Sequence, residues 1–236
     1  MSFRGNEKVL DNISFSVAEN EFVSILGPNS CGKSTLLNII AGILEHYEGE
    51  ITYSKSNPKR SYAFQDPLSV LLPWRDVIGN IMFPFEIRGY SKKKSRDLAG
   101  RFVSGTLLES HLNKYAFELS GGLVQLTSIF RSLAYQPDIL LMDEPFSNIG
   151  VNEKMQLIDQ IMGLWQSNRT TTIMATHDIN DAIFLSDRII ILTPKPSTIR
   201  KIIDVPLQRP RDYNLISSKP FQDIQAEVYG MVRENI

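Results

Sequence analysis

The chain has 236 residues, 42% of them hydrophobic, which is enough for one compact domain with a core of its own. Lys and Arg number 25 against 26 Asp and Glu, so the formal net charge of −1 lacks the basic excess of a dedicated nucleic-acid binder, and no nucleic-acid partner is expected. The single cysteine, Cys31, excludes an intrachain disulfide and fits a reducing compartment. The N-terminal sequence MSFRGNEK lacks the apolar stretch of a signal peptide, and no apolar run approaches the ~20 residues that span a bilayer, so any membrane role is expected to be peripheral.

The first predicted element in chain order is a short buried strand, residues 22–26, that leads into a glycine-rich loop. The loop satisfies the phosphate-binding pattern G-x-x-x-x-G-K-[ST] and is followed by a helical sequence. Its residues are Gly27, Pro28, Asn29, Ser30, Cys31, Gly32, Lys33 and Ser34, with Thr35 after them. Small side chains let backbone N–H groups surround a phosphate, and the helix N-terminus adds partial positive charge. In such a loop Lys33 reaches the outer phosphates and Ser34 ligates Mg²⁺, whereas Cys31, with no evident base beside it, is interpreted as a small filling residue.

Helix-forming stretches with charged faces follow, among them residues 91–103, and no comparable buried strand interrupts them. This succession of helix-forming stretches predicts an inserted helical subdomain over residues 73–135. The core is then built from residues 1–72 and 136–205. Towards its end, Ser120, Gly121 and Gly122 precede a predicted helix, which makes a second anion-binding helix N-terminus.

The next predicted strand, residues 139–142, ends in two adjacent carboxylates. This arrangement places a Mg²⁺-organising Asp143 beside a water-polarising Glu144. An acidic pair at a strand end is more often a solvated turn, but the phosphate-binding loop earlier in the chain favours the catalytic interpretation.

Three further elements are predicted before the chain ends. Apolar residues recur at helical spacing and predict a helix packed on the sheet: Leu157, Ile158, Ile161, Met162 and Trp165. Residues 172–175 predict a third buried strand. Residues 206–236 predict a C-terminal helical extension, in which prolines precede a helix with one apolar face: Phe221, Ile224, Val228 and Val232.

Together these motifs resemble the ABC ATPase family over essentially the whole chain, because Leu119-Ser120-Gly121-Gly122 matches its LSGG hallmark between the phosphate loop and the Asp143-Glu144 strand. The resemblance implies an α/β fold: a P-loop NTPase (RecA-like) core with a mainly parallel sheet, an antiparallel β portion at the N-terminus and the inserted helical subdomain. It also implies that Gln65 resembles the Q-loop glutamine and His177 the switch histidine. Phe3 lies where the family carries an adenine-stacking aromatic, although simple packing explains it equally well.

In the family, two subunits face each other head to tail, so that ATP held at Lys33 of one copy is closed over by the Ser120 loop of the other. The resemblance therefore implies a homodimer that hydrolyses ATP with Mg²⁺. Glu144 would polarise the water and His177 would hold the γ-phosphate, while the expected Mg²⁺ residues are Ser34, Gln65 and Asp143. The implied partners are a multi-span membrane permease and a separate solute-binding protein, and the implied location is cytoplasmic, on the inner face of the membrane. The sequences of residues 71–77 and 206–211 resemble the corresponding segments of importers for nitrate, sulfonates, taurine or thiamine precursors.

Three positions depart from the family pattern: Ser30 stands for a Gly, Leu126 for an Arg, and Gly150 for the Asp that ends the D-loop. The sequence also predicts a first edge strand that is shortened or absent. These departures leave open a degenerate binding module with weak or no hydrolysis. A soluble ABC ATPase of DNA repair or translation would show a long coiled coil or two cassettes, and a small-molecule P-loop kinase would leave Ser120, Gly121 and Gly122 unexplained.

Overall fold

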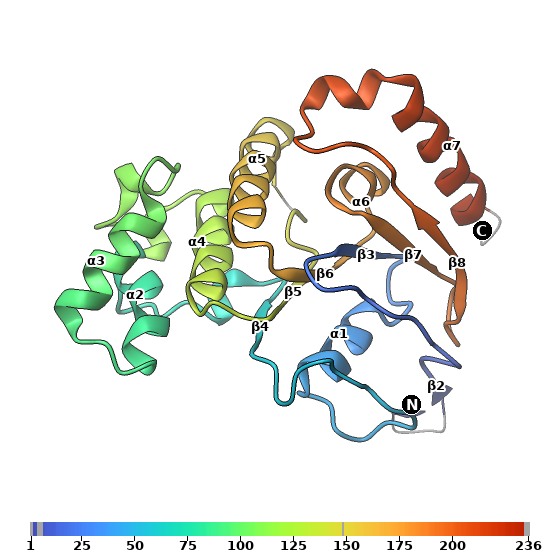
Figure 1. Cartoon of the computed structure of the whole chain (residues 1–236), viewed down its shortest axis with the longest axis horizontal. Helices are drawn as coiled ribbons and strands as arrows, with labels where there is room; N and C mark the ends of the chain where they lie inside the picture. Colours follow the sequence, from blue (N-terminus) through green and yellow to red (C-terminus); the bar gives the residue numbers. More distant parts are fainter. Residues whose placement is uncertain (1, 4–6, 148, 234–236) are drawn as a thin grey trace. The chain divides into compact units, whose positions relative to one another are not determined.

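The computed structural model (Figure 1) describes residues 2–3, 7–147 and 149–233, with the backbone alone at positions 2, 3, 7, 151 and 152. The chain folds into two compact units. The first comprises Met1–Ser56, Leu141–Glu144 and Thr171–Ile236, and the second comprises Asn57–Leu140 and Pro145–Thr170.

The first unit is built on parallel strands rich in apolar residues. Strand β3 (Phe22–Leu26) is parallel to β6 (Thr171–Thr176) and to β7 (Arg188–Leu192), with Phe22 opposite Thr172 and Val23 opposite Arg188. All of β3 and nearly all of β6 and β7 are buried, as expected for strands covered on both faces. The predicted strands at 22–26 and 172–175 are confirmed.

An antiparallel strand and an antiparallel pair complete the β-structure of this unit. Strand β8 (Ile199–Asp204) pairs antiparallel with β7, and the short strands β1 (Ser2–Phe3) and β2 (Glu7–Lys8) pair antiparallel with each other near the N-terminus. The sheet order is β4-β5-β6-β3-β7-β8, in which β5 (Ile139–Asp143) contributes residues to both units. The predicted α/β class with a mainly parallel sheet and an antiparallel N-terminal portion is thus confirmed.

Three helices belong to the first unit: α1 (Lys33–Ala41), α6 (Ile179–Leu185) and α7 (Lys219–Arg233). Helix α1 ends at Gly42, whose φ of 77° gives the left-handed C-cap that glycine adopts without a Cβ penalty. Helix α6 begins at Asp178, whose carboxylate accepts hydrogen bonds from the N–H groups of Asn180 and Asp181. Phe221 and Val228 of α7 are buried, so the predicted apolar face of the last helix packs inward.

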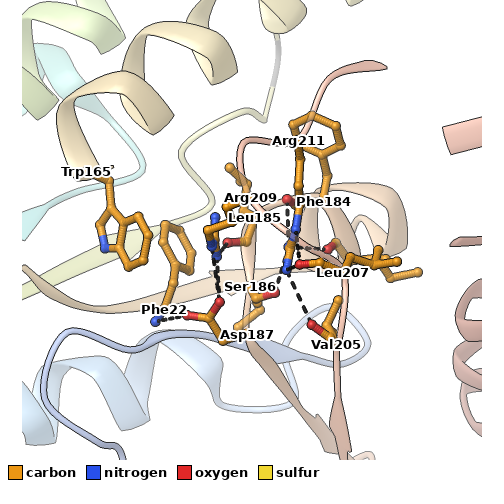
Figure 2. A network of polar contacts seen from close by, with 12 residues as sticks. Phe22, Trp165, Phe184, Leu185, Ser186, Asp187, Val205, Leu207, Arg209 and Arg211 are labelled. Carbon is orange, nitrogen blue, oxygen red and sulfur yellow. Dashed lines mark hydrogen bonds and ion pairs between the residues drawn. The ribbon is translucent and has the colours of Figure 1, made fainter. Parts of the chain in front are cut away.

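The segment before α7 is attached to the unit by two arginines (Figure 2). Arg211 is buried, and among the described residues its guanidinium donates to the main-chain oxygens of Ile183, Phe184, Ser186, Val205 and Leu207. Arg209 binds the Asp187 carboxylate at 2.9 Å, and the other oxygen of that carboxylate accepts the N–H of Phe22 at the start of β3. Burial, with a smaller effect of the Arg209 charge, lowers the pKa of Arg211 to about 10, so the guanidinium is still charged at neutral pH.

The second unit is mainly helical. Besides β4 (Arg60–Ala63) it contains α2 (Val77–Ile87), α3 (Lys92–Val103), α4 (Gly121–Ala134) and α5 (Val151–Asn168), with short 3₁₀ turns at Pro67–Ser69, Glu109–His111 and Ala116–Glu118. Helix α2 packs on both α3 and α4. The α5 residues predicted to form an apolar stripe are all buried, so the predicted helix and the burial of its stripe are confirmed.

Candidate functional site

The glycine-rich loop between β3 and α1 has a backbone that depends on left-handed residues. Gly32, the N-cap of α1, has φ 112°, and Ser30 has φ 61°. A Cβ at Gly27 would overlap Cys31 Sγ and press on Leu192, so this turn requires a residue without a side chain. The loop thus brings its main chain closely around the start of α1, the geometry expected of a phosphate-binding turn.

Cys31 lies inside this loop, where its main-chain oxygen accepts a hydrogen bond from the Ser197 hydroxyl. Burial raises the pKa of the Cys31 thiol, although the nearby Lys33 charge acts in the opposite direction. A buried thiol with a raised pKa is a poor nucleophile, which agrees with its interpretation as a filling residue.

Lys33 is only 6% exposed, and its ammonium group contacts three oxygen atoms. Nζ donates to the main-chain oxygens of Gly27 at 2.9 Å and Pro28 at 3.2 Å, and it lies 3.3 Å from Oε1 of Glu144. The lysine charge is therefore held directly over the loop, beside the carboxylate of Glu144 at the end of β5.

Glu144 occupies the first position after β5 and joins two other elements. Its φ is 46°, and its N–H donates to the oxygen of Ala175 in β6 at 2.9 Å. The carboxylate is nearly buried, at 9% residue exposure, and Oε2 accepts a hydrogen bond from Nδ1 of His177 at 2.8 Å. Because a carboxylate only accepts, Nδ1 carries the proton in this contact.

These contacts bring an ammonium, a carboxylate and an imidazole together at the carboxyl ends of β3, β5 and β6. Lys33, Glu144 and His177 all belong to the first unit, and the His177 side chain is 53% exposed, so the cluster is reachable from solvent. Ligands of open α/β sheets bind at this edge of the strands. A fixed cation beside a carboxylate suits phosphoryl transfer to water, in which positioning and charge stabilisation matter most.

The donors expected to hold Mg²⁺ are oxygens, the ligand type that this ion prefers. Ser34 is exposed in the first turn of α1, and Asp143 is buried at the end of β5. No group of three or more His, Cys, Asp or Glu side chains that could hold a metal ion occurs in the part of the chain that the structure describes. Ser34 and Asp143 supply oxygen donors of the type that Mg²⁺ takes alongside phosphate and water oxygens.

In the second unit, Ser120 is the N-cap of α4. Its hydroxyl accepts the N–H of Leu123 at 3.4 Å and donates to Oε1 of Glu153 in the first turn of α5 at 2.5 Å. Gly122 is buried beneath this contact, and a Cβ there would overlap the Glu153 side chain, whereas Gly121 is exposed. Sequence reasoning missed Glu153, because no local pattern connects it with a serine 33 residues away.

The two other predicted site residues are Gln65 and Phe3. Gln65 is exposed in the second unit, between β4 and the 3₁₀ turn at Pro67–Ser69. Phe3 lies in β1, and its side chain falls outside the described part of the chain. Their roles remain predictions.

The three departures from the family pattern each have a structural setting. Ser30 takes up the left-handed backbone itself, Leu126 is fully buried in α4, and Gly150 is the N-cap of α5 with open space where a Cβ would lie. The Leu126 side chain is thus part of the apolar core around α4.

None of the helices that the structure describes combines the length and apolar character needed to traverse a bilayer.

Comparison with known proteins places these features in a family context. A family model described as ABC transporter matches residues 10–147. An uncharacterized ABC transporter ATP-binding protein of Methanocaldococcus jannaschii is 36% identical over 99% of this chain and 88% of its own length. An aliphatic sulfonates import ATP-binding protein of Bacillus cereus is 37% identical over 95% of this chain and 88% of its own length.

Solved structures show the same fold. The dimeric structure of a bacterial ABC transporter cassette has a TM-score of 0.71 and 27% identity, covering 85% of this chain and 92% of that one. A dimeric post-hydrolysis cassette bound to ADP and Pi has a TM-score of 0.69 and 26% identity over the same shares of the two chains.

Proposed function

The chain belongs to the ABC transporter family as an ATP-binding subunit, and on this premise we propose that it hydrolyses MgATP within a homodimer to energise import of a small solute. The observation that carries the proposal is the Lys33–Glu144–His177 cluster at the phosphate-binding loop. It combines a phosphate-binding cation, a general base and a polar group that orients that base.

Each residue of the cluster has a distinct task. Lys33 binds the outer phosphates of ATP, and Glu144 accepts the proton of the attacking water. His177 fixes the Glu144 carboxylate through Nδ1–H and offers Nε2 to the γ-phosphate side. Because His177 is half exposed whereas Glu144 is nearly buried, the histidine can approach a bound nucleotide while the base stays shielded from bulk water.

The remaining residues complete the nucleotide site. The main-chain N–H groups of the loop from Gly27 to Thr35 surround the phosphates. Ser34, Asp143 and Gln65 are the residues that would hold Mg²⁺, which would neutralise charge on the phosphates. Ser120, Gly121 and Gly122 of one copy close over the ATP of the other, and Phe3 stacks on the adenine. ATP thereby favours a closed dimer whose opening after hydrolysis can drive a mechanical partner.

The transported solute is recognised by other proteins. A multi-span membrane permease and a separate solute-binding protein are the proposed partners, and the chain works at the inner face of the membrane. The sulfonate importer relatives, together with the segments at 71–77 and 206–211, support a small anionic or sulfur-containing solute: a sulfonate, taurine, nitrate or a thiamine precursor.

The test is MgATP hydrolysis by the purified chain, followed as phosphate release, with the oligomeric state measured by light scattering. We expect saturable ATP binding, turnover and a nucleotide-dependent dimer, all of them lost in Lys33→Ala. A chain that binds MgATP without any turnover would instead indicate the non-hydrolysing binding module, and a chain that binds no MgATP would refute the proposal.

A further inference from the structure

The contact between Ser120 and Glu153 places a carboxylate where the proposed function requires a phosphate. Glu153 is the third helical residue of α5, and its Oε1 lies 2.5 Å from the Ser120 hydroxyl at the N-terminus of α4. Both residues belong to the second unit, so the contact is made within one chain.

The hydroxyl group can serve only one acceptor at a time. A serine side chain has one O–H donor, and an ionised carboxylate accepts but does not donate. While Ser120 donates to Glu153 it cannot donate to a nucleotide phosphate. The Glu153 charge would also repel the phosphate, because two anions at one helix N-terminus compete for the same partial positive charge.

The space around Gly122 shows how closely the carboxylate fits this position. A Cβ at Gly122 would overlap the carboxyl group and Cγ of Glu153, so the side chain lies directly against the glycine backbone of the α4 N-terminus. Glu153 is also in the first turn of its own helix, whose N-cap Gly150 makes no side-chain hydrogen bond. The positive ends of two helices thus favour a negative charge at this point.

We propose that Glu153 is an internal competitor of the nucleotide phosphate, which holds Ser120 in the same chain and has to release it before the ATP of a second copy can be clasped. This inference rests on the proposed nucleotide-sandwich function. Glu153 thereby opposes closure of the dimer. The closed dimer forms only when the phosphate contacts contribute more free energy than the Ser120–Glu153 hydrogen bond that they replace. Removing the carboxylate should therefore lower the MgATP concentration needed for closure without changing ATP binding by a single copy.

The experiment uses the full chain with Glu144→Gln, a background in which slow hydrolysis allows the closed dimer to accumulate. The MgATP concentration at half-maximal dimer formation is measured by light scattering for this variant and after adding Glu153→Ala or Glu153→Gln. We expect the midpoint to fall about fivefold or more with Glu153→Ala, the lower end of typical coupling between sites. Glu153→Gln, which is neutral but can still accept the hydrogen bond, should give a smaller fall.

Asp159→Asn is the matched control, because Asp159 is an exposed carboxylate on the same helix. The MgATP concentration at half-maximal dimer formation should stay unchanged in this control. In all variants, the affinity of a single copy for ATP should also stay unchanged, measured at protein concentrations too low for dimers to form. An unchanged or raised midpoint in both Glu153 variants would overturn this inference alone and make the contact a plain structural bond. Failure of the Glu144→Gln chain to dimerise at saturating MgATP would instead overturn the proposed function, and this inference with it.

Discussion

Nδ1 of His177 donates a hydrogen bond to Oε2 of Glu144 over 2.8 Å, while Oε1 of the same carboxylate lies 3.3 Å from Lys33 Nζ. The general base proposed for hydrolysis is thus oriented from both sides by two residues, Lys33 of α1 and His177 of the turn between β6 and α6. Its left-handed backbone, with φ 46°, adds to this constraint. The Glu144 carboxylate is therefore held in a single orientation relative to an attacking water.

Replacing Glu144 by Gln should lower turnover by ~10²-fold or more while ATP binding is retained, because the amide keeps the size of the side chain but cannot take a proton. Phosphate release at saturating MgATP and a nucleotide titration measure the two effects. Glu227→Gln, which removes an exposed carboxylate paired with Lys201, serves as the control and should leave turnover unchanged. Near-normal hydrolysis in Glu144→Gln would show that another group is the base.

Ser30→Gly should stabilise the fold by up to about 1 kcal/mol, because Ser30 adopts the left-handed conformation in which its Cβ is unfavourable. The free energy of unfolding from denaturant titration measures the effect. Ser104, with φ −62°, is the comparison position. Ser104→Gly should be destabilising, since only the unfolded chain gains freedom there; the same sign at both positions would contradict this account.

Arg211→Met should lower the free energy of unfolding by about 3 kcal/mol, because five buried main-chain oxygens would lose a charged donor at once. Arg211→Lys keeps the charge but has fewer N–H donors, so its free energy of unfolding should lie between those of the unchanged chain and Arg211→Met. The control is Arg101→Met on α3, whose exposed pair with Asp97 should contribute less than about 1 kcal/mol. Equal losses at positions 211 and 101 would contradict the anchoring role of Arg211.

Cys31 should react slowly with thiol reagents in the folded chain. Its pKa is raised by burial, so at any pH below that value the folded protein carries less thiolate than an exposed cysteine, and the thiolate is the reactive form. Reaction rates between pH 7 and 9, with and without denaturant, measure this. Unfolding should accelerate the reaction at every pH, and a native rate equal to the unfolded rate would disprove the prediction.

Much of the fold was predictable because its signals are local. Residues 22–26 are a short apolar run followed at once by the phosphate-binding pattern, and Ser91 precedes residues 92–103 as the N-cap that accepts the N–H of Lys94. Strand β8 lacked such a signal, because adjacent Arg200 and Lys201 leave its sequence with neither a continuous apolar run nor a strict apolar–polar alternation.

The parts of the site that escaped prediction depend on contacts between distant positions. Ser120 and Glu153 are separated in sequence by helix α4, strand β5 and a loop, so neither periodicity nor motif spacing relates them. Arg211 looked like one more charge in a proline-rich tail, and only the folded chain shows that it is buried. Lys33 and Glu144 were assignable because each sits in a recognisable local pattern, although the 3.3 Å contact between them was not.

The Arg211 anchor recognises the course of the main chain rather than any particular side chain, since every acceptor it uses is a carbonyl oxygen. Sequence drift at positions 183–186, 205 and 207 can therefore leave the anchor intact as long as the backbone path is kept. The neighbouring Arg209 differs in this respect, because its partner is the Asp187 carboxylate, so a substitution at position 187 would remove that contact and leave the Arg211 hydrogen bonds in place.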